Sequence, residues 1–225
     1  MHLKPSLLPT KCRYCDKDRL HQSSLFYYLA NQDELCETCR KQLRYAPKTF
    51  EVRDIKVQSY YEYNDFLKSI ILQYKECYDE ALKDVFFYDL NFKLRMKYHD
   101  FTIVLVPSSK SNLERRGFNH LALMCQKIGL PIADILEKEK DLSQNNLGLI
   151  KRQKMVDNIK LKEGSYRPER ILLIDDILTT GSSIYGAYKA LKNPYNRIIP
   201  ITLSYVNHAG HSKIWSMYVI IIEFI

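Results

Sequence analysis

The sequence is poor in glycine and proline, with 7 and 8 residues among 225, and it has no long apolar run. So few chain-breaking residues argue against linkers and low-complexity regions, and most of the chain is expected to be ordered. The most apolar segment, the eleven residues from Trp215 to Ile225, includes Glu223. It is shorter than the ~20 residues of a membrane-spanning helix, so we expect no membrane span and a terminal strand there.

The chain also opens without the pattern of a secretion signal, because two prolines and two lysines interrupt the first eleven residues, MHLKPSLLPTK. We therefore expect a cytoplasmic protein. The phosphate-binding signatures G-x-x-x-x-G-K-[ST] and G-x-G-x-x-G are both absent from the sequence. A nucleotide triphosphatase is accordingly not expected, because the acidic strand end described below would need such a partner loop.

Positive charge, in contrast, is in excess, with a net charge of +8. Basic residues outnumber acidic ones by 10 to 7 in residues 1–55 and by 13 to 8 in residues 106–170. This bias suits phosphate-rich partners, nucleic acid included, although a solvated basic surface has the same composition. The 17 tyrosines fit base stacking on a nucleic-acid strand or ordinary core packing, and the sequence leaves both readings open.

Four of the six cysteines form two C-x-x-C pairs, Cys12 with Cys15 and Cys36 with Cys39. Each pair lets two thiolates reach one ion from a tight turn, and two pairs complete a tetrahedral site with no open position. The spacing predicts structural Zn²⁺. Redox pairs or disulfides fit poorly with a chain that lacks a secretion signal. A module of this size has little core of its own, so the metal would supply its folding energy.

Apolar strand-like segments then alternate with helical ones, which predicts an α/β domain with a mostly parallel sheet flanked by helices. We assign residues 1–50 to the cysteine module and 51–225 to this domain, with an atypical tail at 205–225. Cys77 and Cys125 lie in helical patterns and are expected to be buried. The expected strands are residues 25–29 of the module, 57–63, 101–107, 132–136, 170–174 and 198–203, and the expected helices are 65–74, 79–97, 119–128 and 182–192.

The most informative stretch is ILLIDDILTTGSS, from Ile171 to Ser183. A buried strand over ILLI would deliver Asp175 and Asp176 to the carboxyl edge of the sheet, where carboxylates suit sugar hydroxyls or Mg²⁺. The following loop enters a helix, so its N–H groups and hydroxyls form an anion cradle. Its residues are Thr179, Thr180, Gly181, Ser182 and Ser183. Phosphate, hydroxyl and cation contacts at one strand end describe a ribose phosphate site, with a purely structural turn as the alternative.

The same stretch resembles the phosphoribosyl-pyrophosphate motif of type I phosphoribosyltransferases. Together with the four-cysteine module, YEYNDFLKSIILQYK and VPSSKSNLERRGFNH, it resembles the ComF family of bacterial competence proteins, ComFC type, up to about Ser204. The resemblance implies a type I phosphoribosyltransferase-like fold. It implies that Asp175 and Asp176 hold the ribose hydroxyls at the catalytic centre and that residues 179–183 hold the 5′-phosphate.

The resemblance also implies ligand-binding roles in a pyrophosphate loop and in the RGFN element, at Ser108, Ser109, Lys110, Arg115 and Arg116. For the two arginines, contact with nucleic acid or solvent stays an alternative. The tract YKECYD lacks the glycine that relatives tend to have after the lysine. The chain also continues beyond the strand with which the family usually ends.

Two functions fit this resemblance. In the first, the chain is a late competence protein that handles incoming single-stranded DNA during natural transformation, and its phosphoribosyl site binds phosphoribosyl pyrophosphate or a related phosphate ligand. A competence helicase-like protein and recombination factors are then the implied partners. In the second, it is an active, Mg²⁺-dependent phosphoribosyltransferase of nucleotide metabolism or salvage. The sequence names no acceptor, and it offers no general base better than the pair of aspartates.

Overall fold

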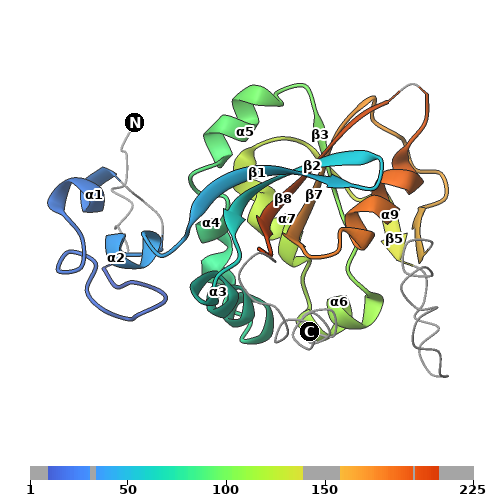
Figure 1. Ribbon diagram of the computed structural model, residues 1–225. Helices are drawn as coiled ribbons and strands as arrows, with labels where there is room; N and C mark the ends of the chain where they lie inside the picture. Colours follow the sequence, from blue (N-terminus) through green and yellow to red (C-terminus); the bar gives the residue numbers. More distant parts are fainter. Residues whose placement is uncertain (1–9, 31–33, 139–157, 195, 208–225) are drawn as a thin grey trace, which may run out of the picture.

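The computed structural model describes residues 10–30, 34–138, 158–194 and 196–207 (Figure 1). Its helices are α1 (Leu25–Ala30), α2 (Glu37–Arg40), α3 (Asp65–Glu76), α4 (Lys83–Phe86), α5 (Asn91–Lys97), α6 (Lys110–Arg116), α7 (His120–Cys125) and α9 (Ser182–Leu191), with 3-10 turns η1 (Glu80–Leu82) and η2 (Gln126–Ile128). Its strands are β1 (Tyr45–Val52), β2 (Ile55–Glu62), β3 (Thr102–Leu105), β4 (Ile132–Ala133), β5 (Leu136–Lys138), β6 (Ile159–Leu161), β7 (Arg170–Leu178) and β8 (Arg197–Tyr205).

Six strands form one sheet in the order β1-β2-β8-β7-β3-β4. β1 and β2 make an antiparallel hairpin at one edge, and every other neighbouring pair in this sheet is parallel. β5 and β6 form a separate antiparallel pair. The predicted α/β fold with a mostly parallel sheet is therefore confirmed. Because β3 and β7 are paired neighbours, the loops that leave their carboxyl ends lie side by side.

Helices cover both faces of the sheet, as the continuous apolar run Ile171 to Ile174 of a central strand requires (Figure 1). Along β7, Leu172 and Ile174 pack with the apolar residues of α3, α4, α5 and α7. The alternate residues Ile171 and Leu173 pack on the other face with those of α9. This alternation fixes which way each side chain of β7 points, and it continues into the acidic end of the strand.

Helix α3 begins where the sequence predicts, because the Asn64 side chain accepts a hydrogen bond from the Leu67 N–H at 2.9 Å. Its buried stripe ends at Tyr74, whose hydroxyl donates to the His120 carbonyl at 2.9 Å. This bond ties the last turn of α3 to the start of α7. Lys75, the next residue, is thereby held beside α7 and the end of β7.

The four-cysteine module packs against the α3 face of the sheet. The ring of Tyr14 meets that of Phe66 edge-on, with 4.7 Å between centroids. Arg40 is buried, and its guanidinium donates to the Val85 carbonyl at 2.9 Å. Three of the four cysteines belong to the same apolar cluster as α3. The module is thus continuous with the main core, and β1, which crosses residue 50, is a strand of the main sheet; the domain boundary placed there stays a prediction.

Several expectations for local structure were wrong. Residues 25–29 form helix α1 instead of a strand, because the Ser24 side chain accepts from the Tyr27 N–H at 3.2 Å and starts a helical turn. The helix expected over residues 79–97 is divided into η1, α4 and α5. The strand expected over 132–136 is two short strands, β4 and β5. Cys77 caps the end of α3 and is exposed, whereas Cys125 is buried as expected.

Strands β1 and β6 and helix α6 had no counterpart in the sequence-based prediction. The tail from residue 208 onward, including the strand expected from Trp215 to Ile225, lies outside the described residues. Across the described part of the chain, none of the helices is both long enough and apolar enough to span a membrane.

Candidate functional site

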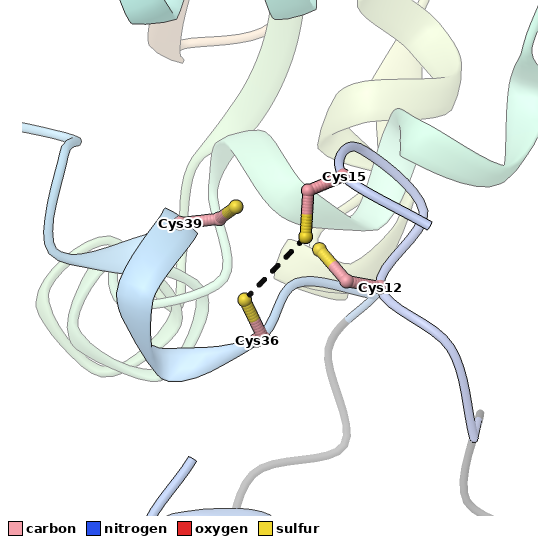
Figure 2. Close-up of side chains that lie close together, drawn as sticks. All are labelled: Cys12, Cys15, Cys36 and Cys39. Atoms are coloured by element: carbon pink, nitrogen blue, oxygen red, sulfur yellow. Dashed lines mark hydrogen bonds between the residues drawn. The ribbon is translucent and has the colours of Figure 1, made fainter. Parts of the chain in front are cut away.

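The four cysteines converge on one point from two short segments that flank residues 17–34. Figure 2 shows their sulfur atoms turned toward one another, and all four lie within 4.8 Å of each other. The Sγ atoms of Cys15 and Cys36 are 4.0 Å apart. Four thiolates around a tetrahedral Zn²⁺ are about 3.8 Å apart at the usual Zn–S length. The donor set therefore fits one tetrahedral metal ion.

The backbone around the cysteines holds the two segments together. The Arg13 N–H donates to the Glu34 carbonyl at 2.9 Å, and the Asp16 N–H donates to the Cys12 carbonyl at 2.8 Å. Arg19 is fully buried and donates to the Leu35 carbonyl at 3.3 Å. Burial raises the pKa of the Cys39 thiol, so binding of a metal ion there would release a proton.

A second candidate site is a pocket of about 180 Å³ at the carboxyl ends of β3 and β7. It brings together most of the ligand-binding residues predicted from the sequence: Ser108, Ser109, Arg116, Asp175, Asp176, Thr179, Thr180, Gly181, Ser182 and Ser183. Arg115 does not line the pocket. Lys110 is the first residue of α6, and its side chain lies outside the described part of the structure.

The loop between β7 and α9 has the geometry of an anion cradle. Gly181 adopts φ +74°, and the first helical hydrogen bond of α9 runs from the Tyr185 N–H to the Gly181 carbonyl at 3.0 Å. The N–H groups that precede this bond have no acceptor within the helix. A Cβ on Gly181 would meet Val52 Cγ1 at 2.5 Å, so the β1–β2 hairpin presses on the loop where only glycine fits.

The opposite wall of the pocket is the start and end of α6. Ser109 caps this helix by accepting from the Asn112 N–H at 3.3 Å. At the other end, Glu76 binds both arginines: Arg115 through two bonds of 2.6 and 3.1 Å, and Arg116 through one of 3.1 Å. Arg116 is buried and Arg115 about half exposed. The two arginines predicted as one element are thus divided between the pocket and the surface.

The adjacent carboxylates Asp175 and Asp176 have different surroundings. One oxygen of Asp175 accepts from the Asp176 N–H at 2.9 Å. Asp176 accepts from the Ile177 N–H at 2.8 Å with Oδ1, while its Oδ2 forms an ion pair with Lys75 and lies 3.4 Å from His120 Nε2. Asp176 is therefore engaged on both oxygens, and Asp175 retains the carboxylate oxygen that a ligand can use.

These surroundings separate the protonation behaviour of the two acids. Burial, together with the neighbouring Asp176 charge, raises the pKa of Asp175 to about 8. Burial acts on Asp176 in the same direction, but the Lys75 ammonium and His120 outweigh it and hold its pKa well below the usual value. Burial and the Lys75 charge lower the pKa of His120 to about 4, so its ring is neutral near pH 7.

The same contacts bear on the Mg²⁺ ion implied by the resemblance. A metal held by both carboxylates would need oxygens of Asp176 that already bind Lys75, His120 and a backbone N–H. The residues at the acid pair therefore do not fit a directly ligated divalent cation. Any such ion would have to be held by phosphate oxygens of the ligand itself.

Four polar residues that the sequence reasoning missed line the pocket: Lys75, Asn112, His120 and Lys138. Lys75 follows the apolar stripe of α3 by one position, so it reads as an ordinary solvated residue at a helix end. His120 follows the capping residue Asn119, whose side chain accepts from the Ala122 N–H at 3.2 Å. The only sequence signal for Lys75 was its place next to the last buried position of a helix. Its partner, Asp176, lies 101 residues away in the sequence.

Comparison with known proteins agrees with the resemblance to ComFC-type proteins noted in the sequence. Over 132 residues the chain is 32% identical to competence protein ComFC of Streptococcus pneumoniae (strain ATCC BAA-255 / R6), covering 59% of this chain and 60% of that protein. It is 27% identical over 158 residues to competence protein ComFC of Bacillus subtilis (strain 168), covering 69% and 64%. Over these stretches the chain is similar to the two ComFC proteins. The matches span less than two thirds of the length of these relatives.

No family model matches the chain. Among solved structures, adenine phosphoribosyltransferase aligns with a TM-score of 0.41 at 13% identity, covering 75% of this chain and 90% of that one. A score this low adds nothing to the fold that strand order and direction already establish. The relation to ComFC therefore rests on the sequence matches, and the four-cysteine cluster agrees with the predicted N-terminal module.

Proposed function

We propose that this protein acts in the cytoplasm during natural transformation, handling incoming single-stranded DNA, and that its pocket binds phosphoribosyl pyrophosphate or a related phosphate ligand. The observation that carries the ligand proposal is the pocket in which the loop after β7 faces the serine loop after β3, with Asp175 between them. Helix-start N–H groups suit a 5′-phosphate. The carboxyl group of Asp175 suits the ribose hydroxyls.

Three residues between β3 and α7, namely Ser108, Ser109 and Arg116, suit the pyrophosphate end of the ligand. Arg116 lines the pocket and is anchored by Glu76, so its charge is held in place before a ligand arrives. Such preorganisation lowers the cost of binding a pyrophosphate group. Ser108 and Ser109 provide hydroxyl groups beside it. Mg²⁺ would enter with the phosphates of the ligand, and Zn²⁺ in the cysteine cluster would be purely structural.

The ligand proposal is tested by calorimetric titration of phosphoribosyl pyrophosphate with Mg²⁺ into the zinc-loaded protein. We expect saturable binding to the wild type and its loss in Asp175→Asn, a variant that leaves the Asp176–Lys75 ion pair intact. Arg95→Gln, in α5 and outside the pocket, is the control and should bind normally. A folded wild type that binds no phosphoribosyl compound would contradict the proposal.

The DNA part rests on the relation to ComFC and on the net charge of +8. Fluorescence anisotropy with a labelled single strand should give an affinity that falls steeply with salt, with a slope of about −0.7 per phosphate neutralised. A 5′-phosphorylated strand that competes with phosphoribosyl pyrophosphate would place the strand end in the pocket. Salt-insensitive or undetectable binding would contradict DNA handling, and helicase-like and recombination partners would then lose their basis.

An active phosphoribosyltransferase is the second candidate, and the raised pKa of Asp175 beside a phosphate cradle favours it, since shifted acids gather at catalytic sites. The reaction would displace pyrophosphate from the anomeric carbon of the sugar. The pocket residues would bind and align the donor, and Arg116 would stabilise the charge on the leaving group. This candidate is tested by measuring pyrophosphate release when a panel of nucleobases is added. If no acceptor causes release, the transferase candidate is rejected and only the ligand-binding proposal remains.

A further inference from the structure

The most unusual feature of the pocket is a lysine that reaches the acid pair from a distant helix. Lys75 comes from the last turn of α3, and its ammonium group forms an ion pair with the Asp176 carboxylate. The two side chains are only 15% and 12% exposed, and both line the pocket. The pair is therefore a fixed part of the wall that a ligand would contact.

A phosphate site beside this acid pair has an electrostatic problem, because the phosphate ligand and the Asp176 carboxylate both carry negative charge. A divalent cation bound to the acids is one solution. In this chain the Oδ2 atom of Asp176 is already shared by Lys75 and by His120, whose Nε2 lies 3.4 Å away. The position beside the acids that a metal would take is filled by an ammonium group of the protein.

The surroundings hold Lys75 in this position. Tyr74, the residue before it, is fully buried, and its hydroxyl donates to the backbone carbonyl of His120. Glu76, the residue after it, binds Arg115 and Arg116. The end of α3 is thus fixed on both sides of Lys75. Its charge requires no ordering step when a ligand arrives, which is what a resident cation must provide.

We propose that Lys75 is the resident cation of this site, so that the pocket binds a ribose 5-phosphate group without Mg²⁺. Asp176 then holds Lys75, and Asp175 is left for the sugar hydroxyls. Lys75 is in this sense a positioning and charge-balancing residue. The inference rests on the proposed phosphate-ligand function, and it adds that the sugar phosphate half of the ligand is recognised by protein groups alone.

The test is calorimetric titration of ribose 5-phosphate into the zinc-loaded protein, with Mg²⁺ and with Mg²⁺ omitted. The Mg²⁺-free buffer is passed over a chelating resin before the protein is added, because EDTA in the sample would strip the cysteine site. We expect the wild-type dissociation constants in the two conditions to agree within about threefold, because no metal is needed at the acids. Lys75→Gln should lose about tenfold or more without Mg²⁺, since a charge-assisted contact is removed. Mg²⁺ should restore part of that loss, because Asp176 is then open to a cation.

Two further variants keep the experiment decisive. Lys75→Arg keeps the positive charge and should retain metal-free binding, even if Lys75→Gln fails to fold in a thermal melt. Lys68→Gln, two turns earlier on α3 and outside the pocket, is the matched control and should behave as the wild type. Wild-type binding that requires Mg²⁺, or metal-free binding unchanged in folded Lys75→Gln, overturns the inference alone. A wild type that binds ribose 5-phosphate in neither condition overturns the proposed function and this inference together.

Discussion

The cysteine cluster and the pocket at the carboxyl ends of β3 and β7 are built in opposite ways. The cluster draws its four donors from two nearby C-x-x-C turns between Cys12 and Cys39, and their spacing alone predicts a tetrahedral site. The pocket draws its residues from α3, α7 and the loops after β3 and β7, over more than 100 positions. A local site can be read from spacing. In an assembled site only the residues that belong to recognisable motifs can be predicted, and here those motifs omit the lysine that neutralises one of the acids.

The two regions also differ in what their residues do for stability. Three of the four cysteines lie in the same apolar cluster as α3 and α4, so a metal ion there would hold together part of the main core. The pocket instead buries charged groups whose mutual attraction offsets the cost of burial only while all partners are present. Removing residues from each region should therefore give effects of different size and kind.

The largest expected effect is that of Cys36→Ser. Loss of one of four thiolates should abolish zinc binding, which in small zinc modules is worth roughly 10–16 kcal/mol of apparent free energy. The module should unfold and lower the melting temperature of the whole chain, because its cysteines are part of the common core. Zinc content and near-ultraviolet circular dichroism measure this. The control is Cys77→Ser, which is exposed and outside the cluster; if both variants keep their zinc, the cluster is not the metal site.

Asp176→Asn should have the next largest effect on stability. The substitution leaves the Lys75 ammonium buried without its counter-charge, and breaking a buried ion pair from one side costs about 3–5 kcal/mol. Urea unfolding at pH 7 measures the change. Adding Lys75→Met to this variant should recover much of the loss, because the pair is then replaced by neutral groups. An Asp176→Asn protein as stable as the wild type would mean that the two aspartates are equivalent after all.

Some secondary structure could be predicted from the sequence, and some could not. The run ILLI predicts the central strand because a strand covered on both faces must be apolar at every position, and β7 is so covered. The cap at Asn64 and the stripe that follows predict α3 correctly. By contrast, residues 25–29 have aromatic and aliphatic side chains typical of a strand, and the Ser24 hydroxyl overrides that preference by starting a helix.

Within the pocket, the aspartates and the glycine loop were predictable because the residues that would carry out their function lie next to one another in the sequence. Lys75 was not, because its meaning depends on a partner that lies on another element. The difference between Asp175 and Asp176 was likewise invisible. Both residues are the same acid at the same strand end, and only the groups packed against them separate their roles.

Gly181→Ala tests whether the loop between β7 and α9 is shaped by the β1–β2 hairpin. A non-glycine residue at φ +74° and a Cβ placed 2.5 Å from Val52 Cγ1 should together cost about 2–4 kcal/mol of stability. Gly117→Ala is the matched control, because that residue has the same φ and its Cβ would meet nothing within 4 Å. Urea unfolding should show a larger loss at Gly181 than at Gly117. Equal losses would mean that backbone conformation alone, without the hairpin contact, requires the glycine.

The smallest expected effect is a pH dependence that separates the two aspartates. Asp175 has a folded pKa of about 8 against an ordinary value of 3.8, so the native state holds a proton that the unfolded chain releases. Its contribution to stability is fully present below pH 3.8 and is lost as pH rises toward 8. His120, with its pKa lowered from 6.5 to about 4, acts in the opposite sense only below pH 6.5.

Between pH 6.5 and 8, therefore, Asp175 alone of these two groups titrates. The free energy of unfolding of the wild type should fall across this window by at most about 1.4 kcal/mol per pH unit. The Asp175→Asn variant cannot ionise at this position, so it should remove that slope. Asp176 is ionised throughout this pH range and contributes no slope, because its pKa is held below the usual value. Urea unfolding at half-unit pH steps measures both proteins. A wild-type slope that persists in Asp175→Asn would assign the proton to another group and remove the distinction between the acids on which the ligand proposal depends.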